Sequence, residues 1–110
     1  MILIYTTFSK KSEIENFSTF LLKNHLAACI NFLPAESIYS WNGVIQSTKE
    51  YCVIIKTIKK DFPKVEKAIL RFNSYEIPCV LEITTGRIHA PYADWLQRMC
   101  NTESEDNAQI

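Results

Sequence analysis

The sequence predicts an α+β domain with the element order β-α-β-β-α-β, followed by a short helix. Three observations predict this class: an apolar run at 2–8, a long hairpin pattern at 28–57, and apolar residues at helical spacing in 13–25 and 62–73. The 110 residues fit one domain, and 47% of them are hydrophobic, which is enough to form a core.

The first unit is a strand followed by a helix. Residues 2–8 begin as a run that is apolar on both faces, which favours a central strand covered on both sides. Ser12 and Glu15 then have the spacing of a capping box, in which the serine hydroxyl accepts from a backbone N–H and the glutamate reaches back. Apolar residues recur at helical spacing behind it, so 13–25 should pack one face on a sheet.

Residues 28–57 predict one long β-hairpin. Asn42-Gly43 lies between apolar residues, and this pair is a strong hairpin signal because both turn positions need positive φ. Pro34 cannot donate to a strand ladder, so the first strand should be kinked there or lie at a sheet edge. The hairpin is longer than a domain of this size can cover, and we expect its tip to project.

A second helix and a fourth strand follow the hairpin. Asp61 can cap a helix over 62–73, with Pro63 in its first turn, where a missing N–H costs nothing. Residues 79–83, which read Cys-Val-Leu-Glu-Ile after Pro78, predict a fourth strand. Pro91 then opens a short amphipathic helix, which completes the set of elements.

The complete order is that of the split βαβ, or ferredoxin-like, fold. In this fold two helices cover one face of a four-stranded antiparallel sheet, and the hairpin at 28–57 supplies two of the four strands. We expect a single domain over residues 1–100. The composition turns polar and acidic at 101–110, which predicts a flexible tail.

Charge and cysteine usage exclude several classes of protein. Lys plus Arg number 12 and Asp plus Glu number 12, so the net charge is zero and nucleic acid is not an expected partner. The N-terminal apolar run is too short for a signal peptide or a membrane span, so no membrane partner is expected either. Four cysteines without a secretory signal predict reduced thiols and a cytoplasmic protein.

Several short motifs occur in series along the chain. They are Leu26-Ala27-Ala28-Cys29-Ile30-Asn31 with Pro34, Ser40-Trp41-Asn42-Gly43, Glu50, Lys56-Thr57, Ser74-Tyr75-Glu76-Ile77-Pro78 and Tyr92-Ala93-Asp94-Trp95-Leu96. Each motif is weak alone, but the set in this order and spacing is specific. From about residue 3 to residue 98, the sequence resembles the CutA family.

The resemblance implies a ferredoxin-like protomer and a tight homotrimer in which long hairpins pair with neighbouring subunits. It also implies an association with tolerance to copper and other divalent cations, and no family-wide enzymatic reaction. We therefore expect a non-enzymatic protein that needs no cofactor and binds copper or another divalent metal ion. Trimers of ferredoxin-like protomers also resemble PII-type signalling proteins, so a sensor of a small polar metabolite, bound between subunits, is the alternative.

The sequence departs from the family pattern just before Tyr75 and just after Pro78. Asn73-Ser74 precedes Tyr75 where His-Pro is usual, and Cys79 follows Pro78 where an acidic residue is usual. A histidine and an acidic ligand are therefore replaced, and a thiol is gained.

Cys29 and Cys79 are the candidate metal ligands. Soft thiolates prefer Cu(I), and the two cysteines can share a metal across a subunit contact if both lie near one. The alternative for Cys29 is a small buried residue on a strand, which is the common fate of free cysteine.

A second candidate group consists of Trp41, Glu50, Lys56 and Tyr75. Glu50 and Lys56 face the same side of their strand because their separation is even. With aromatics nearby, they can bind a small polar ligand in an inter-subunit cleft, or they can form a buried salt bridge that fixes the trimer. The sequence leaves both open. It nominates no catalytic residue, because no Cys-His or Ser-His pair has a recognisable motif.

Overall fold

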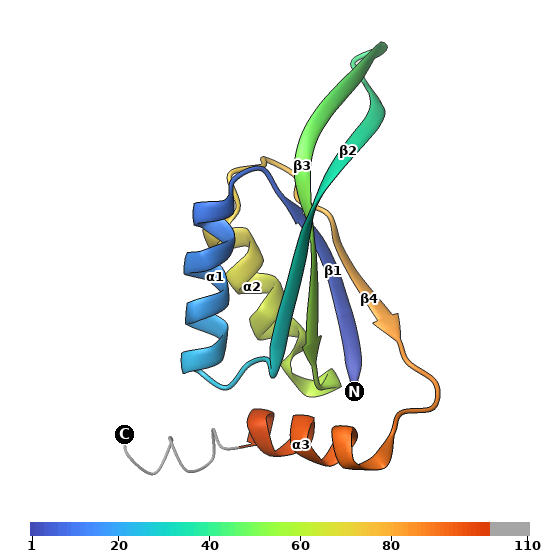
Figure 1. Ribbon diagram of the computed structural model, residues 1–110. Helices are drawn as coiled ribbons and strands as arrows, with labels where there is room; N and C mark the ends of the chain where they lie inside the picture. Colours follow the sequence, from blue (N-terminus) through green and yellow to red (C-terminus); the bar gives the residue numbers. More distant parts are fainter. Residues whose placement is uncertain (102–110) are drawn as a thin grey trace.

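The computed structural model describes residues 1–101, which form a four-stranded antiparallel sheet with three helices (Figure 1). The elements are β1 (Ile2–Phe8), α1 (Lys11–Lys23), β2 (Cys29–Trp41), β3 (Val44–Thr57), the 3-10 turn η1 (Lys59–Asp61), α2 (Phe62–Phe72), β4 (Val80–Thr84) and α3 (Ala90–Asn101). The strand order is β2-β3-β1-β4. This confirms the predicted α+β, ferredoxin-like arrangement.

The helices α1 and α2 lie side by side on one face of the sheet, and the core lies between them and the strands (Figure 1). Ile2, Ile4 and Phe8 of β1 point into this core and are almost fully buried. β1 is central, as predicted, but the helices cover only one of its faces. The prediction of a strand covered on both sides is therefore wrong within the protomer.

The sheet face turned away from α1 and α2 is called the open face here. Strand side chains alternate between faces, so this face carries Leu3 and Tyr5 of β1 with their neighbours in register, Ile54 on β3 and Leu81 and Ile83 on β4. Leu81 and Ile83 are 52% and 44% exposed. One protomer thus leaves a largely apolar sheet face without a covering layer.

The hairpin forms as predicted. Asn42 and Gly43 have φ values of 51° and 76°, and β2 and β3 pair without interruption from Cys29↔Lys56 to Trp41↔Val44. β2 is an edge strand, which is where proline is tolerated, and Pro34 lies within it. The far half of the hairpin extends beyond the helices (Figure 1).

The predicted helix caps are wrong in detail. Only Ser9 and Lys10 separate β1 from α1, so the helix begins at Lys11 and Ser12 lies in its first turn instead of at the cap. No side-chain hydrogen bond caps the N-terminus of α1. Asp61 does stand at the cap position of α2, again without a capping side-chain hydrogen bond, and Pro63 lies in the first turn as predicted.

The helix α3 packs against the end of the sheet rather than against α1 and α2. Leu96 and Cys100 are buried there with Ala28 and Ile58. Asn101 ends this helix, and the rest of the predicted tail lies outside the described residues. Among residues 1–101, no helix is both long enough and apolar enough to cross a membrane.

Candidate functional site

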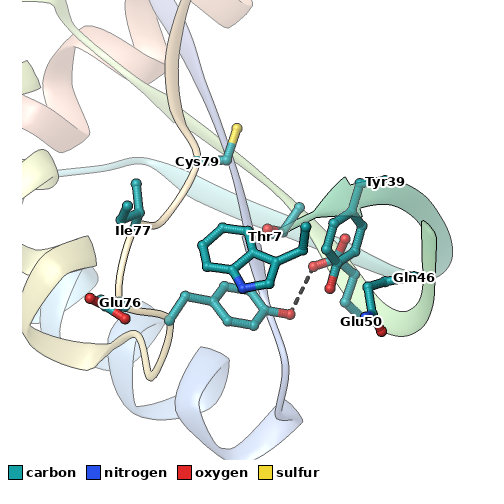
Figure 2. A pocket seen from close by; sticks show the side chains of 9 residues that line it. Thr7, Tyr39, Gln46, Glu50, Glu76, Ile77 and Cys79 are labelled. Carbon is teal, nitrogen blue, oxygen red and sulfur yellow. Dashed lines mark hydrogen bonds between the residues drawn. The ribbon is translucent and has the colours of Figure 1, made fainter. Parts of the chain in front are cut away.

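A pocket of about 570 Å³ lies where the hairpin leaves the body of the sheet (Figure 2). Its lining comes from β1, β2, β3 and the segment between α2 and β4: Thr7, Tyr39, Trp41, Gln46, Glu50, Tyr75, Glu76, Ile77 and Cys79. The volume falls in the range of small-molecule sites, and the walls combine aromatic rings with a few polar groups, as such sites do. We call it the hairpin pocket.

Glu50 is the most heavily bonded side chain of the hairpin pocket. The hydroxyl of Tyr75 donates to Oε1 of Glu50 at 2.8 Å, the contact drawn as a dashed line in Figure 2. The hydroxyl of Ser37 donates to Oε2. Both carboxylate oxygens are therefore held, one by the segment after α2 and one by β2. Two charge-assisted hydrogen bonds of this kind fix the orientation of the carboxylate.

Asn73 positions Tyr75. Its Nδ2 donates to the carbonyl oxygen of Thr7 at 2.8 Å, and its Oδ1 accepts from the backbone N–H of Tyr75 at 2.9 Å. The segment after α2 is thus tied to the end of β1. Asn73 stands where the resembled family usually has histidine, and in this chain it has a clear structural role. No sequence pattern predicts that role, because the two partners of Asn73 are backbone groups.

Two groups of the hairpin pocket have raised pKa values. Burial, with the hydrogen bond to Glu50, raises the pKa of Tyr75, so this phenol stays protonated and donates at neutral pH. Burial, with the nearby charge of Glu50, also raises the pKa of the Cys79 thiol. Because a metal takes the thiolate, a metal ion at Cys79 would have to displace a proton, and its binding would strengthen as pH rises.

Tyr5, on the open face, has a raised pKa that makes the stability of the fold depend on pH at alkaline values. Its hydroxyl lies 3.1 Å from Sγ of Cys52, and this hydrogen bond, followed by burial, raises the pKa of Tyr5 to about 12. The unfolded chain loses this proton near pH 10, whereas the folded chain keeps it. The contribution of Tyr5 to stability is therefore complete below pH 10 and is lost as pH rises toward 12.

We expect the free energy of unfolding of the Tyr5→Phe variant to fall less than that of the parent as the pH rises from 9 to 11. Urea unfolding at fixed protomer concentration measures this, and absorbance at 295 nm follows the phenols directly. Tyrosine titration of the protein in guanidinium is the control, since all five tyrosines then ionise near pH 10. An unchanged alkaline end of the folded titration curve in Tyr5→Phe would contradict the assignment.

The structure brings three of the four predicted cleft residues together. Trp41, Glu50 and Tyr75 line the hairpin pocket, but Lys56 does not. Lys56 is six residues further along β3, about 20 Å from Glu50, and its Nζ lies 5.6 Å from the ring centre of Tyr92 on α3. Within one protomer Glu50 and Lys56 therefore cannot form an ion pair.

The two predicted metal ligands lie far apart. Cys79 lines the hairpin pocket, whereas Cys29 begins β2 opposite Lys56. The strands β2 and β4 are the two edges of the sheet, about 14 Å apart, so the two thiols cannot share a metal within one protomer. Cys29 is only partly buried, and residues 1–101 contain no cluster of three or more His, Cys, Asp or Glu side chains that could hold a metal ion.

The sequence analysis did not identify Ser37 as a partner of Glu50, although the register of the hairpin predicts that the two residues are neighbours. With the turn at Asn42-Gly43, Ala35 pairs with Glu50 and Ser37 pairs with Thr48. Ser37 is then the diagonal neighbour of Glu50, within reach of a long side chain.

Comparisons with known proteins agree with this fold. The family model described as CutA1 divalent ion tolerance protein matches residues 2–99. A "Divalent-cation tolerance protein CutA" of Archaeoglobus fulgidus is 33% identical over 93 residues, which are 84% of this chain and 91% of the relative. A "Probable divalent-cation tolerance protein cutA homolog" of Encephalitozoon cuniculi is 29% identical over 106 residues, which are 96% of this chain and 90% of the relative.

Solved structures show the same similarity. The structure of a "Periplasmic divalent cation tolerance protein CutA" from Archaeoglobus fulgidus superposes with a TM-score of 0.88 at 31% identity, covering 92% of this chain and all of the other. The structure of CutA from Synechococcus elongatus superposes with a TM-score of 0.86 at 26% identity, covering 91% of this chain and 89% of the other.

Proposed function

The chain belongs to the CutA1 divalent ion tolerance protein family, and from that premise we propose that it works as a non-enzymatic homotrimer that binds copper or a divalent cation directly. The observation that carries the proposal is that one protomer supplies only some of the ligands that a metal ion needs. The hairpin pocket is lined by one thiol, Cys79, and two carboxylates, Glu50 and Glu76, which do not form a cluster able to hold a metal ion among residues 1–101, and it opens beside surfaces that a neighbouring copy can cover.

The apolar surface of the protomer supports assembly. Leu81 and Ile83 on the open face are about half exposed, and Ile38 and Ile45 on the far half of the hairpin are 75% and 78% exposed. Large apolar side chains left exposed on both faces of the sheet and hairpin favour burial against another copy. A hairpin that reaches past its own helices can lie against a neighbouring subunit, as the family resemblance implies. The stoichiometry of three rests on that resemblance.

Cys79 is the better placed of the two candidate thiols. It lies in the hairpin pocket with Glu50, so a soft and a hard ligand share one cavity. Cys29 lies at the opposite end of the sheet, where the neighbouring cation is Lys56. A metal bound by Cys79 and Glu50 would complete its coordination with groups of the next subunit.

Copper titration separates the two thiols. We expect Cys79→Ser to weaken Cu(I) binding at least about tenfold, since even outer partners of metal ligands contribute that much. Cys29→Ser is the matched control and should bind as the parent does. A chromophoric chelator competing for Cu(I) measures both. Binding by Cys79→Ser equal to the parent's would exclude the thiol site, and a loss confined to Cys29→Ser would move it to the other end of the sheet.

A trimeric sensor of a small polar metabolite is the second candidate. The aromatic walls of the hairpin pocket, Tyr39, Trp41 and Tyr75, favour an organic ligand over a bare ion. Native mass spectrometry of the purified protein tests it. A bound metabolite that disappears in Glu50→Gln would support this function in place of metal binding.

We also propose a cytoplasmic location. All four cysteines are free thiols, which suits a reducing compartment. The Archaeoglobus fulgidus structure is described as that of a periplasmic protein, which concerns that protein.

A further inference from the structure

The walls of the hairpin pocket combine aromatic rings with negative charge. Three of its nine lining residues are large aromatics, Tyr39, Trp41 and Tyr75, and two are carboxylates, Glu50 and Glu76. Figure 2 shows Tyr39 and Glu50 on one side of the pocket and Glu76 on the other. Tyr39 and Trp41 are exposed in the protomer, so a ligand can reach their rings. Among the described residues, the lining contains no Lys, Arg or His, and both ring faces and carboxylates attract a cation.

The register of the hairpin places two of these rings and one carboxylate on the same side. Tyr39 and Trp41 are two residues apart on β2, and Ala35, the partner of Glu50 in the register, lies four residues before Tyr39. Because side chains alternate along a strand and paired residues share a face, all three groups point the same way. Lys49 precedes Glu50 on β3 and faces the other side, so its ammonium group does not line the pocket.

Hydrogen bonds hold two of the rings and the carboxylate in place. The hydroxyl of Tyr75 donates to Oε1 of Glu50 at 2.8 Å, and the hydroxyl of Ser37 donates to Oε2. The hydroxyls of Tyr39 and Thr48 lie 2.9 Å apart. Because hydrogen bonds polarise their partners, donation to a carboxylate makes the ring of Tyr75 a better face for a cation. Groups that are oriented in advance also lose less side-chain entropy when a ligand binds.

The hydrogen bonds of Glu50 also decide which kind of cation fits. A primary ammonium group carries three N–H donors, and each needs an acceptor when the group leaves water. Both oxygens of Glu50 already accept from hydroxyls, and the aromatic walls offer ring faces in place of lone pairs. A quaternary ammonium group has no N–H and packs its methyl groups against rings. The volume of about 570 Å³ is that of a site for an organic molecule.

We propose that the hairpin pocket binds a small organic cation with a quaternary ammonium group, which lies against the rings of Tyr39, Trp41 and Tyr75 while Glu50 balances its charge. This inference rests on the second function proposed above, the sensor of a small polar metabolite, and it names the chemical class of that metabolite. Metal binding is not part of it, because the cation contacts rings and a carboxylate and needs no thiolate.

Titration of the unmodified protein with choline, in a buffer that contains a metal chelator, tests the proposal. The chain has two tryptophans, so its NMR spectrum contains two indole N–H signals, which the Trp41→Phe variant assigns. We expect the signal of Trp41 to shift as choline is added. Trp95 on α3 is the internal control, and its signal should stay in place. No shift of the Trp41 signal, or equal shifts of both signals, would overturn the proposal.

Two analogues of choline test its charge and its methyl groups separately. The carbon isostere has a neutral tert-butyl group in place of the trimethylammonium group, and ethanolamine keeps the charge but has no methyl groups. Each should bind at least about fivefold more weakly than choline, the effect of losing one cation–π contact. A carbon isostere that binds as well as choline would show that the pocket does not recognise charge. Tighter binding of ethanolamine would show that it recognises N–H donors, and either result would overturn the proposal.

Variants of the pocket are measured by calorimetry, which does not depend on the indole signal. Trp41→Leu and Glu50→Gln should each weaken choline binding at least about fivefold, whereas Trp41→Phe keeps an aromatic face and should stay closer to the parent. Tyr92→Leu is the matched control, because Tyr92 lies on α3 beneath Lys56 and outside the pocket lining, and it should bind as the parent does. Unchanged binding in both Trp41→Leu and Glu50→Gln would overturn the proposal.

Native mass spectrometry separates this inference from the function on which it rests. A neutral or anionic metabolite that disappears in Glu50→Gln would support the sensor and would overturn the quaternary ammonium ligand. A bound quaternary ammonium ion that disappears in the same variant would support both. The chelator keeps metal out of the choline titration, so a failure of copper binding at Cys79 and a failure of choline binding are separate results.

Discussion

Leu81→Glu should convert the proposed trimer into monomers that remain folded. Leu81 lies on the open face beside Tyr5 and is 52% exposed in the protomer, so a carboxylate there is tolerated by a single chain. Inside a subunit contact the same carboxylate would be buried without a partner, which costs several kcal/mol for each copy. Sedimentation velocity in dilute neutral buffer should show a threefold fall in mass, with an unchanged far-ultraviolet circular dichroism spectrum.

Leu70→Glu is the matched control for this experiment. Leu70 is 57% exposed on α2, on the helical layer rather than on the open face, and the same substitution there should leave the mass unchanged. A Leu81→Glu protein that sediments like the parent would show that the open face is not the contact. A parent protein at monomer mass would refute the trimer itself.

Phe17→Ala should destabilise the fold by about 3–5 kcal/mol, the range for removing a buried aromatic side chain. Phe17 is fully buried on α1, and its ring centre lies 5.1 Å from that of Phe8 on β1 and 6.2 Å from that of Phe72 on α2. The ring therefore joins both helices to the central strand. Urea unfolding at fixed protomer concentration measures the loss.

Leu22→Ala is the control for the core experiment. Leu22 lies on the same helix but is 46% exposed, so its truncation removes little packing and should cost less than about 1 kcal/mol. Equal losses for the two variants would show that Phe17 is not at the centre of the core.

Local signals predicted most of the fold. Asn42-Gly43 fixed the turn of the hairpin because few residue pairs adopt positive φ twice, and the structure has both angles. The start of α1 was misplaced because Ser12 has a suitable side chain but the short connection after Phe8 begins the helix earlier. The two-residue connection between β1 and α1 therefore decided where the helix begins, and the capping preference of Ser12 did not.

The candidate site was predictable only in part. Sequence spacing predicts which side of a strand a residue faces, but it does not bring two residues on that side into contact. Even spacing put Glu50 and Lys56 on one side of β3, which is correct, but the two residues are six positions apart along the strand. The distance between Cys29 and Cys79 depends on the order of the strands in the sheet. The pattern of residues along the chain does not predict which strands form the edges. Tyr75 reaches Glu50 only because Asn73 ties its segment to β1, a contact between residues 66 positions apart.

The position of β2 at the sheet edge has a consequence for proteins that have not yet assembled. A long edge strand offers its outer backbone groups to any other strand, and this is a common route to aggregation. Pro34 removes one backbone donor from β2 and divides it into a short segment before the proline and a longer one toward the turn. An intruding strand therefore cannot pair along the whole edge, and the proline limits aggregation of the newly made chain through this edge.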